Sequence, residues 1–236
     1  MKYKYKRLLL KLSGEALMGK KKFGIDKIYI NRYAEEIKKI VNIGIQVAIV
    51  IGGGNFFRGL KINFINRIYG DYMGMMSTLI NSIALKSFLE NLGITVILQT
   101  PMSIGQISEK YNINKSIKYL KEGNVVIFPS GIGIPYFTTD TAAIIRGLEI
   151  NADIILKGTK VDGVYNIDPI IYKNKYKKIY NNISFKKAYK IGLKFMDQTA
   201  FTLGHENNIK MIIFNINKKG NLKKIVCGEK IGTIIY

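Results

Sequence analysis

The 236 residues include 37 Lys or Arg and 16 Asp or Glu, which gives a formal net charge of +21, and 47% of them are hydrophobic. This composition predicts a folded protein with a substantial core, and the single cysteine and single histidine exclude internal disulfides and a Cys/His metal site within one chain. No apolar run approaches the ~18 residues that span a membrane, and the run at 8–10 is too short for a signal peptide, so we expect a soluble, cytoplasmic protein without a membrane partner.

Predicted strands and helices alternate along the chain, which is typical of an α/β fold with a mainly parallel sheet. The expected strands are, in chain order, the apolar run that ends at Lys11 and the segments 45–51, 94–98, 124–128, 153–157, 210–214 and 232–236. The expected helices are one that ends before Gly44, one at 71–91, one at 115–121, one that begins near Thr139 and two within 184–208. No repeat or linker marks a boundary, so we expect a single domain over residues 1–236.

Loops that are rich in glycine or otherwise unusual follow four of these strands, at 13–14, 52–54, 131–139 and 158–163. In a parallel sheet the carboxyl ends of the strands meet at one edge, where open α/β sheets bind ligands. Glycine lets the backbone approach a ligand, and helix N-termini add partial positive charge, so we expect this edge to bind phosphate. Neither G-x-x-x-x-G-K-[ST] nor G-x-G-x-x-G is complete, so the common nucleotide fingerprints are absent.

Charged side chains gather at the same predicted edge: Lys11, Arg58, Asp140, Lys157 and Asp168. Cations among glycine turns suit phosphoryl transfer, because catalysis there consists mainly of positioning and of stabilising charge on the moving group, with Mg²⁺ bridging nucleotide oxygens. From the residues alone, Lys11 has two interpretations. It belongs either to a structural ion pair with Glu15 or another carboxylate, or to a phosphate site in which its partner is absent until nucleotide binds.

Several motifs together resemble one family: "YKRLLLKLSGEAL", "VAIVIGGGNFFRG", "GDYMGM", "PYFTTD", "TKVDGVY" and "MDQTAFTL". They occur in order between about residues 5 and 235, and they closely resemble the bacterial uridylate kinases, the UMP kinases of the amino acid kinase superfamily. The resemblance implies a three-layer α/β/α fold and transfer of the γ-phosphoryl group of ATP to UMP, which gives UDP and ADP in pyrimidine nucleotide synthesis. It also implies that Mg²⁺ arrives with ATP rather than on dedicated protein ligands.

The resemblance further implies roles for individual residues. The implied catalytic residues are Lys11, Asp140 and Lys157, with Asp140 orienting Lys11 or Mg²⁺. The implied ATP site comprises Lys11, Leu12, Ser13, Gly14, Gly54, Arg58, Thr159, Tyr165 and Asp168. The implied UMP site comprises Gly53, Asp71, Ile132, Gly133, Ile134, Pro135, Tyr136, Phe137, Thr138 and Thr139. As a separate expectation, the resemblance implies a UMP-binding side roughly in the N-terminal half of the domain and an ATP-binding side roughly in the C-terminal half.

Two segments depart from the family pattern. The family usually has G-x-G-N-P where this chain has Gly133-Ile134-Pro135, so an aliphatic side chain replaces an amide near UMP or a neighbouring subunit. The segment that the family associates with activation by GTP reads Gly19, Lys20, Lys21, Lys22, Phe23 and Gly24, and we expect its loss of acidic character to weaken or alter that control. Bacterial members are homohexamers inhibited by UTP, and the resemblance implies both properties here.

Other interpretations remain open at this stage. Asp71 can instead cap the helix that follows it, and Asp140 can simply favour a helix start. A related kinase that phosphorylates a carboxylate or carbamate is one alternative function. The other is a basic nucleic-acid-binding protein that has kept a kinase fold, but the lysines are dispersed along the chain, which favours solvated faces over a specific nucleic-acid site.

Overall fold

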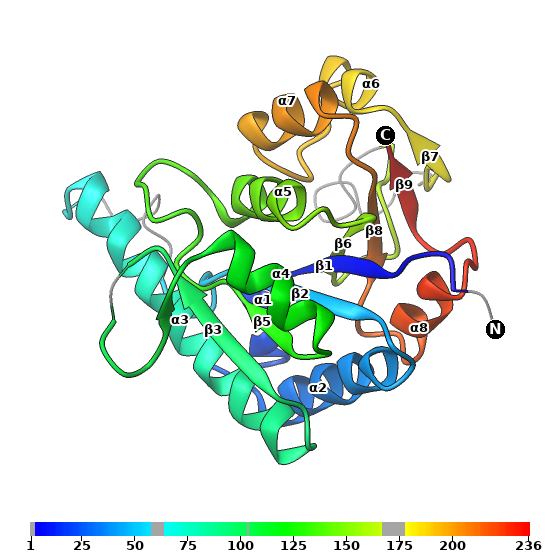
Figure 1. The fold of residues 1–236 in the computed structure, drawn as a ribbon. Helices are drawn as coiled ribbons and strands as arrows, with labels where there is room; N and C mark the ends of the chain where they lie inside the picture. Colours follow the sequence, from blue (N-terminus) through cyan, green and yellow to red (C-terminus); the bar gives the residue numbers. More distant parts are fainter. Residues whose placement is uncertain (1–2, 58–63, 103, 167–177) are drawn as a thin grey trace.

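The computed structural model describes residues 3–57, 64–102, 104–166 and 178–236. Within them, nine strands form one sheet in the order β4-β3-β5-β2-β1-β6-β8-β9-β7 (Figure 1). The strands are β1 (Arg7–Leu12), β2 (Gln46–Ile51), β3 (Val96–Thr100), β4 (Glu109–Lys110), β5 (Val125–Ile127), β6 (Ile154–Thr159), β7 (Asn182–Ile183), β8 (Met211–Asn215) and β9 (Thr233–Ile235). All pairings between these strands are parallel except that of β8 with β9. The predicted mainly parallel sheet is confirmed.

Helices cover both faces of this sheet (Figure 1). They are α1 (Gly14–Met18), α2 (Lys27–Val41), α3 (Arg67–Asn91), α4 (Ile113–Lys121), α5 (Thr139–Glu149), α6 (Phe185–Lys190), α7 (Gln198–Glu206) and α8 (Asn221–Val226). One core contains side chains of α1, α2, α3 and α8. The other contains side chains of α4, α5, α6 and α7. The two cores lie on opposite faces, so the fold is the expected three-layer α/β/α arrangement.

Strand β1 lies between β2 and β6 and is buried on both faces. Leu8, Leu10 and Leu12 belong to the core beneath α1, α2 and α3, whereas Leu9 belongs to the core beneath α5. Because successive side chains of a strand point to opposite faces, Lys11 shares the face of Leu9. The sequence therefore directs this lysine toward the N-terminus of α5 rather than toward solvent.

Some element boundaries differ from the sequence-based expectation. Helix α3 begins at Arg67 instead of residue 71, because the Asn66 side chain accepts a hydrogen bond from the Ile68 N–H and caps the helix there. The short elements α1, β4, β7 and α8 were not predicted, since a few residues cannot display a hydrophobic period. The two helices expected within 184–208 are confirmed as α6 and α7.

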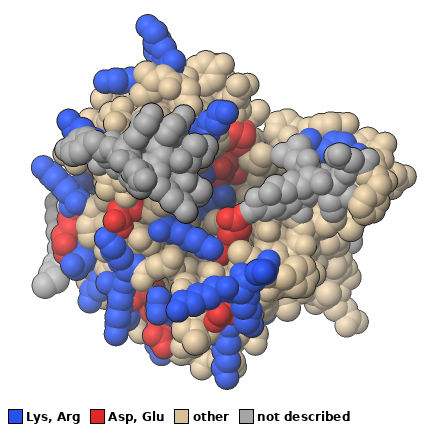
Figure 2. All heavy atoms as spheres, turned by 180° about the vertical axis from the view of Figure 1, so that it is seen from behind, with Lys and Arg blue, Asp and Glu red and all other residues tan. Residues whose placement is uncertain are grey.

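Basic side chains are spread over the face shown in Figure 2, with Asp and Glu side chains between them. This dispersion agrees with the pattern of the sequence, in which lysines occur in several separate segments. In the described part of the chain, no helix has the length and apolar character that crossing a membrane requires.

Candidate active site

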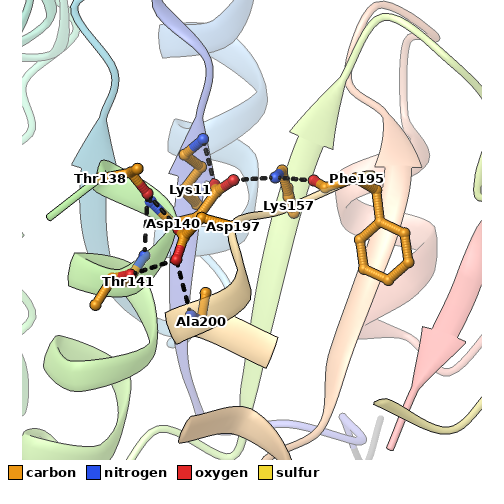
Figure 3. A network of polar contacts seen from close by, with 8 residues as sticks. All are labelled: Lys11, Thr138, Asp140, Thr141, Lys157, Phe195, Asp197 and Ala200. Carbon is orange, nitrogen blue, oxygen red and sulfur yellow. Dashed lines mark hydrogen bonds and ion pairs between the residues drawn. The ribbon is translucent and has the colours of Figure 1, made fainter. Parts of the chain in front are cut away.

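Two lysines from neighbouring strands meet one carboxylate at the carboxyl edge of the sheet. Lys11 on β1 and Lys157 on β6 are paired in register, so their side chains lie side by side on one face. The Asp140 carboxylate lies between them, with Oδ1 at 2.5 Å from Lys11 Nζ and Oδ2 at 2.6 Å from Lys157 Nζ (Figure 3). Both lysines are more than 90% buried. The three residues that the resemblance implies as catalytic therefore form one cluster, called here the lysine cluster.

The structure shows a partner of Lys11 within the protein. Its ammonium pairs with Asp140, which is in the first turn of α5, so the expectation that its partner arrives only with nucleotide is wrong. The pairing has a physical cause, because two like charges side by side on adjacent strands repel each other unless an opposite charge compensates them. With both lysines protonated, Lys11, Asp140 and Lys157 together keep one excess positive charge, which the nearby Asp197 carboxylate partly offsets at Lys157.

The pKa values of the cluster reflect this balance. Burial by itself raises the pKa of Asp140, but the adjacent Lys11 and Lys157 ammonium groups outweigh burial and hold that pKa well below its usual range. Burial lowers the pKa of Lys157 from 10.5 to about 8, a shift that Asp140 opposes and Lys11 reinforces. The carboxylate thus stays ionised at neutral pH, whereas Lys157 titrates close to the physiological range.

Asp197 is a residue of the site that sequence reasoning did not single out, although it belongs to the quoted "MDQTAFTL" motif. Its carboxylate accepts hydrogen bonds from Thr138 Oγ1 at 2.5 Å, Thr141 Oγ1 at 2.9 Å and the Ala200 N–H at 2.9 Å (Figure 3). Nearby, Lys157 Nζ donates to the Phe195 carbonyl at 2.5 Å. The segment before α7 therefore holds both the start of α5 and the second lysine of the cluster.

Two glycine turns meet backbone to backbone beside the lysine cluster. A Cβ atom on Gly14 would lie 2.5 Å from the Gly52 carbonyl oxygen and 2.9 Å from the Gly54 nitrogen, so only glycine fits between the turns. Residues 12–14 and 52–54 thus form one continuous backbone surface. The predicted grouping of these loops at one edge is confirmed, which places Leu12, Ser13, Gly14 and Gly54 close to one another.

An open cavity of about 140 Å³ is lined in part by Gly53 of the second glycine turn. Seven of the ten residues implied for UMP line it: Gly53, Asp71, Ile132, Ile134, Phe137, Thr138 and Thr139. Gly133, Pro135 and Tyr136 belong to the same loop but are not among the lining residues. Sequence reasoning missed other lining residues, among them Thr78 and Ser130. The signal for Thr78 was weak, because it lies within a long helix whose other residues are mostly packing residues.

The loop at 130–138, called here the cavity loop, is held by side chains from elsewhere in the chain. Thr78 Oγ1 accepts from the Ser130 N–H at 2.7 Å, and Asp71 Oδ2 accepts from the Tyr136 N–H at 2.8 Å. Asp71 also pairs with Arg67 at 2.8 Å. Because Asn66 rather than Asp71 caps α3, the capping interpretation of Asp71 is wrong. This carboxylate instead ties α3 to the cavity loop.

The remaining implied residues are more scattered. Thr159 ends β6, where its hydroxyl donates to backbone carbonyls, and Tyr165 pairs with Ile179 in an isolated antiparallel bridge. Arg58 and Asp168 lie outside the described residues. The segment 19–24 lies beside the second glycine turn, since Asn55 exchanges hydrogen bonds with Gly24 and the Phe23 ring packs edge-on against Phe56.

The described residues include no group of three or more His, Cys, Asp or Glu side chains that could hold a metal ion. At the lysine cluster, Asp140 is the carboxylate nearest to the excess positive charge. Mg²⁺ commonly keeps several waters and binds through one or two carboxylates together with substrate phosphates. The donor set therefore fits a cation that enters with a phosphate ligand rather than one that the protein holds by itself.

Comparison with known proteins gives consistent relatives. Residues 6–215 match the amino acid kinase family. A uridylate kinase from Parabacteroides distasonis is 48% identical over 234 residues, which cover 98% of each chain. The structure of a UMP kinase from Bacillus anthracis matches with a TM-score of 0.93 at 36% identity, over 98% of this chain and 96% of that one. A UMP kinase from Ureaplasma parvum matches with a TM-score of 0.89 at 39% identity, over 98% of both chains.

Proposed function

Because the chain belongs to the amino acid kinase family, we propose that it transfers the γ-phosphoryl group of ATP to UMP and forms UDP and ADP in pyrimidine nucleotide synthesis. The observation that carries the proposal is the lysine cluster beside the two glycine turns and the cavity, an arrangement that can place two anionic substrates on either side of fixed positive charge. A nearly full-length relative named uridylate kinase and two similar structures of UMP kinases support the choice of UMP as the acceptor.

In the proposed reaction, an oxygen of the UMP phosphate attacks the γ-phosphorus of ATP. The bond from that phosphorus to the bridging β-γ oxygen breaks, and ADP leaves with the electron pair. Negative charge on the moving group is stabilised by Lys11 and Lys157, whose ammonium groups are already fixed by Asp140. Because the protein needs only to position the reactants and to offset charge, no protein nucleophile is required.

We assign the phosphates of ATP to the backbone surface that the two glycine turns form, with Lys11, Leu12, Ser13, Gly14 and Gly54. Thr159 and Tyr165 would lie toward the adenosine end. Arg58 and Asp168 complete the proposed ATP site by resemblance alone, since they lie outside the described residues. Mg²⁺ bound to ATP would neutralise phosphate charge, and Asp140 is the carboxylate that would take part in holding it.

We assign UMP to the cavity and the cavity loop. Gly53 allows the second glycine turn to approach α3 closely, because a Cβ there would lie 2.8 Å from the Gly74 carbonyl oxygen. Asp71 is positioned to accept hydrogen bonds at the rim of the cavity. Ile132 and Ile134 give the loop an apolar surface where the family usually has an amide at the second position.

We also propose that the protein works in the cytoplasm as a single-domain subunit of a homohexamer, controlled by GTP and UTP. Several large apolar side chains of α3 are exposed in the single chain: Ile68, Tyr69, Tyr72, Met73, Ile80 and Ile83. Such a row on one helix favours contact with another subunit. The lysine-rich segment 19–24 is the proposed site of the response to GTP, and its contacts with Asn55 and Phe56 give it a route to the second glycine turn.

An acceptor panel tests the proposed function. ADP release would be measured with MgATP and, separately, UMP, CMP, aspartate or acetylglutamate as the acceptor. We expect efficient turnover with UMP and little with the others. A preference for aspartate, acetylglutamate or CMP would overturn the proposal, and so would strong, salt-sensitive nucleic-acid binding without any ADP release.

A further inference from the structure

Arg146 is a buried cation that the proposed chemistry does not use. It lies on α5, and only 4% of its surface is exposed. One guanidinium nitrogen pairs with Glu149 Oε2 at 2.7 Å, and another donates to the Gly131 carbonyl at 3.3 Å. Burial of an arginine is costly unless its charge and its donors are satisfied. Its retention in the core calls for a role that an apolar side chain could not fill.

The surroundings of Arg146 fix the plane of its guanidinium. The group lies over the ring of Tyr111, 3.5 Å from the ring centroid, and Phe128 packs edge-on against that ring. The Tyr111 hydroxyl donates to the same Glu149 oxygen at 2.5 Å. Stacking and a shared carboxylate leave the side chain little freedom. The guanidinium is therefore a rigid support rather than a mobile surface charge.

Arg146 contacts the beginning of the cavity loop through the Gly131 carbonyl. Ser130 and Gly131 both have positive φ angles, 62° and 60°, so the chain turns sharply there. Such a conformation is unfavourable for serine and persists only where neighbouring contacts maintain it. Three contacts are present: the Gly133 N–H donates to the Ser130 carbonyl within the turn, Thr78 Oγ1 accepts from the Ser130 N–H, and Arg146 donates to the Gly131 carbonyl. Ser130, Gly131 and Ile132 all line the cavity.

We propose that Arg146 is a positioning residue for UMP, which sets the conformation of the cavity loop from beneath without touching either substrate. The inference rests on the proposed function, because it identifies UMP as the ligand of the cavity. Loss of the support would let the loop leave its bound conformation, so UMP would have to restore that conformation on binding. The KM for UMP should then rise while the transfer step, which depends on the lysine cluster, stays nearly unchanged.

The first test is Arg146→Lys with steady-state kinetics for both substrates. A lysine can keep a charge near Glu149. Its single ammonium cannot, however, donate to Glu149 and to the Gly131 carbonyl from two fixed directions as the planar guanidinium does. We expect the KM for UMP to rise about tenfold, the effect of losing one well-placed contact, with kcat and the KM for ATP changed by no more than about twofold. Equal loss in all three parameters, or an unchanged KM for UMP, would overturn the proposal.

Arg32→Lys is the matched control. Arg32 lies on α2, stacks over Tyr29 at 5.3 Å from the ring centroid and donates to the Asn217 carbonyl at 3.5 Å, away from the cavity. Like Arg146, it combines an aromatic contact with a hydrogen bond to a backbone carbonyl, but it is only partly buried and has no link to the cavity loop. We expect wild-type kinetics for this variant. A rise in its KM for UMP as large as that of Arg146→Lys would mean that the effect comes from general loosening.

A second readout does not depend on UMP. The chain contains no tryptophan, so Phe137→Trp places a single fluorophore in the cavity loop. In this background we expect Arg146→Lys to increase acrylamide quenching of the indole and Arg32→Lys to leave it unchanged. Equal quenching in all three proteins would overturn the positioning role. If quenching increases but wild type does not phosphorylate UMP, the proposed function fails while the support of the loop by Arg146 stands.

Discussion

The lysine cluster and the cavity loop lie next to each other but are built in opposite ways. The cluster takes its side chains from two central strands and the first turn of a helix, and its charges compensate one another at 2.5–2.6 Å. The cavity loop has positive φ at Ser130, Gly131, Gly133 and Tyr136 and depends on contacts from distant elements. The charges of the cluster are thus fixed by one another in the structure without ligand, whereas the conformation of the cavity loop depends on hydrogen bonds from other elements.

Lys11→Met should have the largest effect on activity, and it should change the lysine cluster without changing the cavity loop. Removing the cation leaves Asp140 paired with Lys157, so we expect the fold to persist. We expect kcat to fall by about 10²–10³, as when one preorganised charge-stabilising group is lost, with a nearly unchanged KM for UMP. Steady-state kinetics and thermal unfolding would be measured together. Lys86→Met, which removes a partly exposed lysine of α3 that pairs with Glu90, is the control and should behave like wild type.

The pH dependence of the steady-state kinetics should show the next largest effect. Because the pKa of Lys157 is about 8, its cation is lost as the pH rises through that value. We expect kcat/KM to fall above about pH 8, by a factor that approaches ten per pH unit. The corresponding fall of kcat, here called its alkaline limb, should begin at a higher pH, because bound phosphates favour the charged form of the lysine. Lys157→Arg should remove the limb. A flat alkaline profile in wild type would argue against a role for the Lys157 charge.

The lowered pKa of Lys157 affects stability in the direction opposite to its effect on activity. Between about pH 8 and 10.5 the unfolded chain binds a proton at Lys157 that the folded chain does not, so this residue makes the free energy of unfolding rise with pH across that window. Chemical denaturation at several pH values would measure the slope in wild type and in Lys157→Arg. Loss of activity together with rising stability would separate titration of the cluster from alkaline unfolding.

Asp71→Asn should affect the cavity loop and spare the cluster. The amide keeps the size of the side chain but weakens the contacts with the Tyr136 N–H and with Arg67. We expect the KM for UMP to rise about tenfold with kcat nearly unchanged, the pattern for a lost binding contact. Kinetics with UMP as the varied substrate would measure it. A fall in kcat with constant KM would place Asp71 with the cluster instead.

Ile134→Asn should have the smallest effect. The side chain is 54% exposed at the rim of the cavity, so the change should alter stability by no more than about 0.5 kcal/mol. Restoring the amide that the family usually has should lower the KM for UMP by a few-fold at most. Ile191→Asn, at an exposed isoleucine directly after α6, is the control for added polarity. A higher KM for UMP in Ile134→Asn would show that the isoleucine itself suits the substrate.

The sequence predicted the regular parts of the molecule better than the contacts between them. Buried strands such as 45–51 were recognisable from continuous hydrophobicity, and the glycine turns from their place after strands. The pairing of Lys11 with Asp140 was suggested by the family resemblance alone, because Asp140 is distant in sequence and the strand register that aligns Lys11 with Lys157 is a property of the folded sheet. Asp197 and Arg146 were missed for the same reason: each acts through hydrogen bonds to residues that only the fold brings near.

In the proposed mechanism, the lysine cluster performs the transfer while the cavity loop binds UMP. The most direct measurement compares Lys11→Met and Asp71→Asn by calorimetric binding of UMP and by single-turnover transfer at saturating UMP. We predict that Lys11→Met binds UMP like wild type but transfers slowly, and that Asp71→Asn binds weakly but transfers at nearly the wild-type rate once saturated. The reverse pattern, or equal loss of binding and transfer in both variants, would contradict the account.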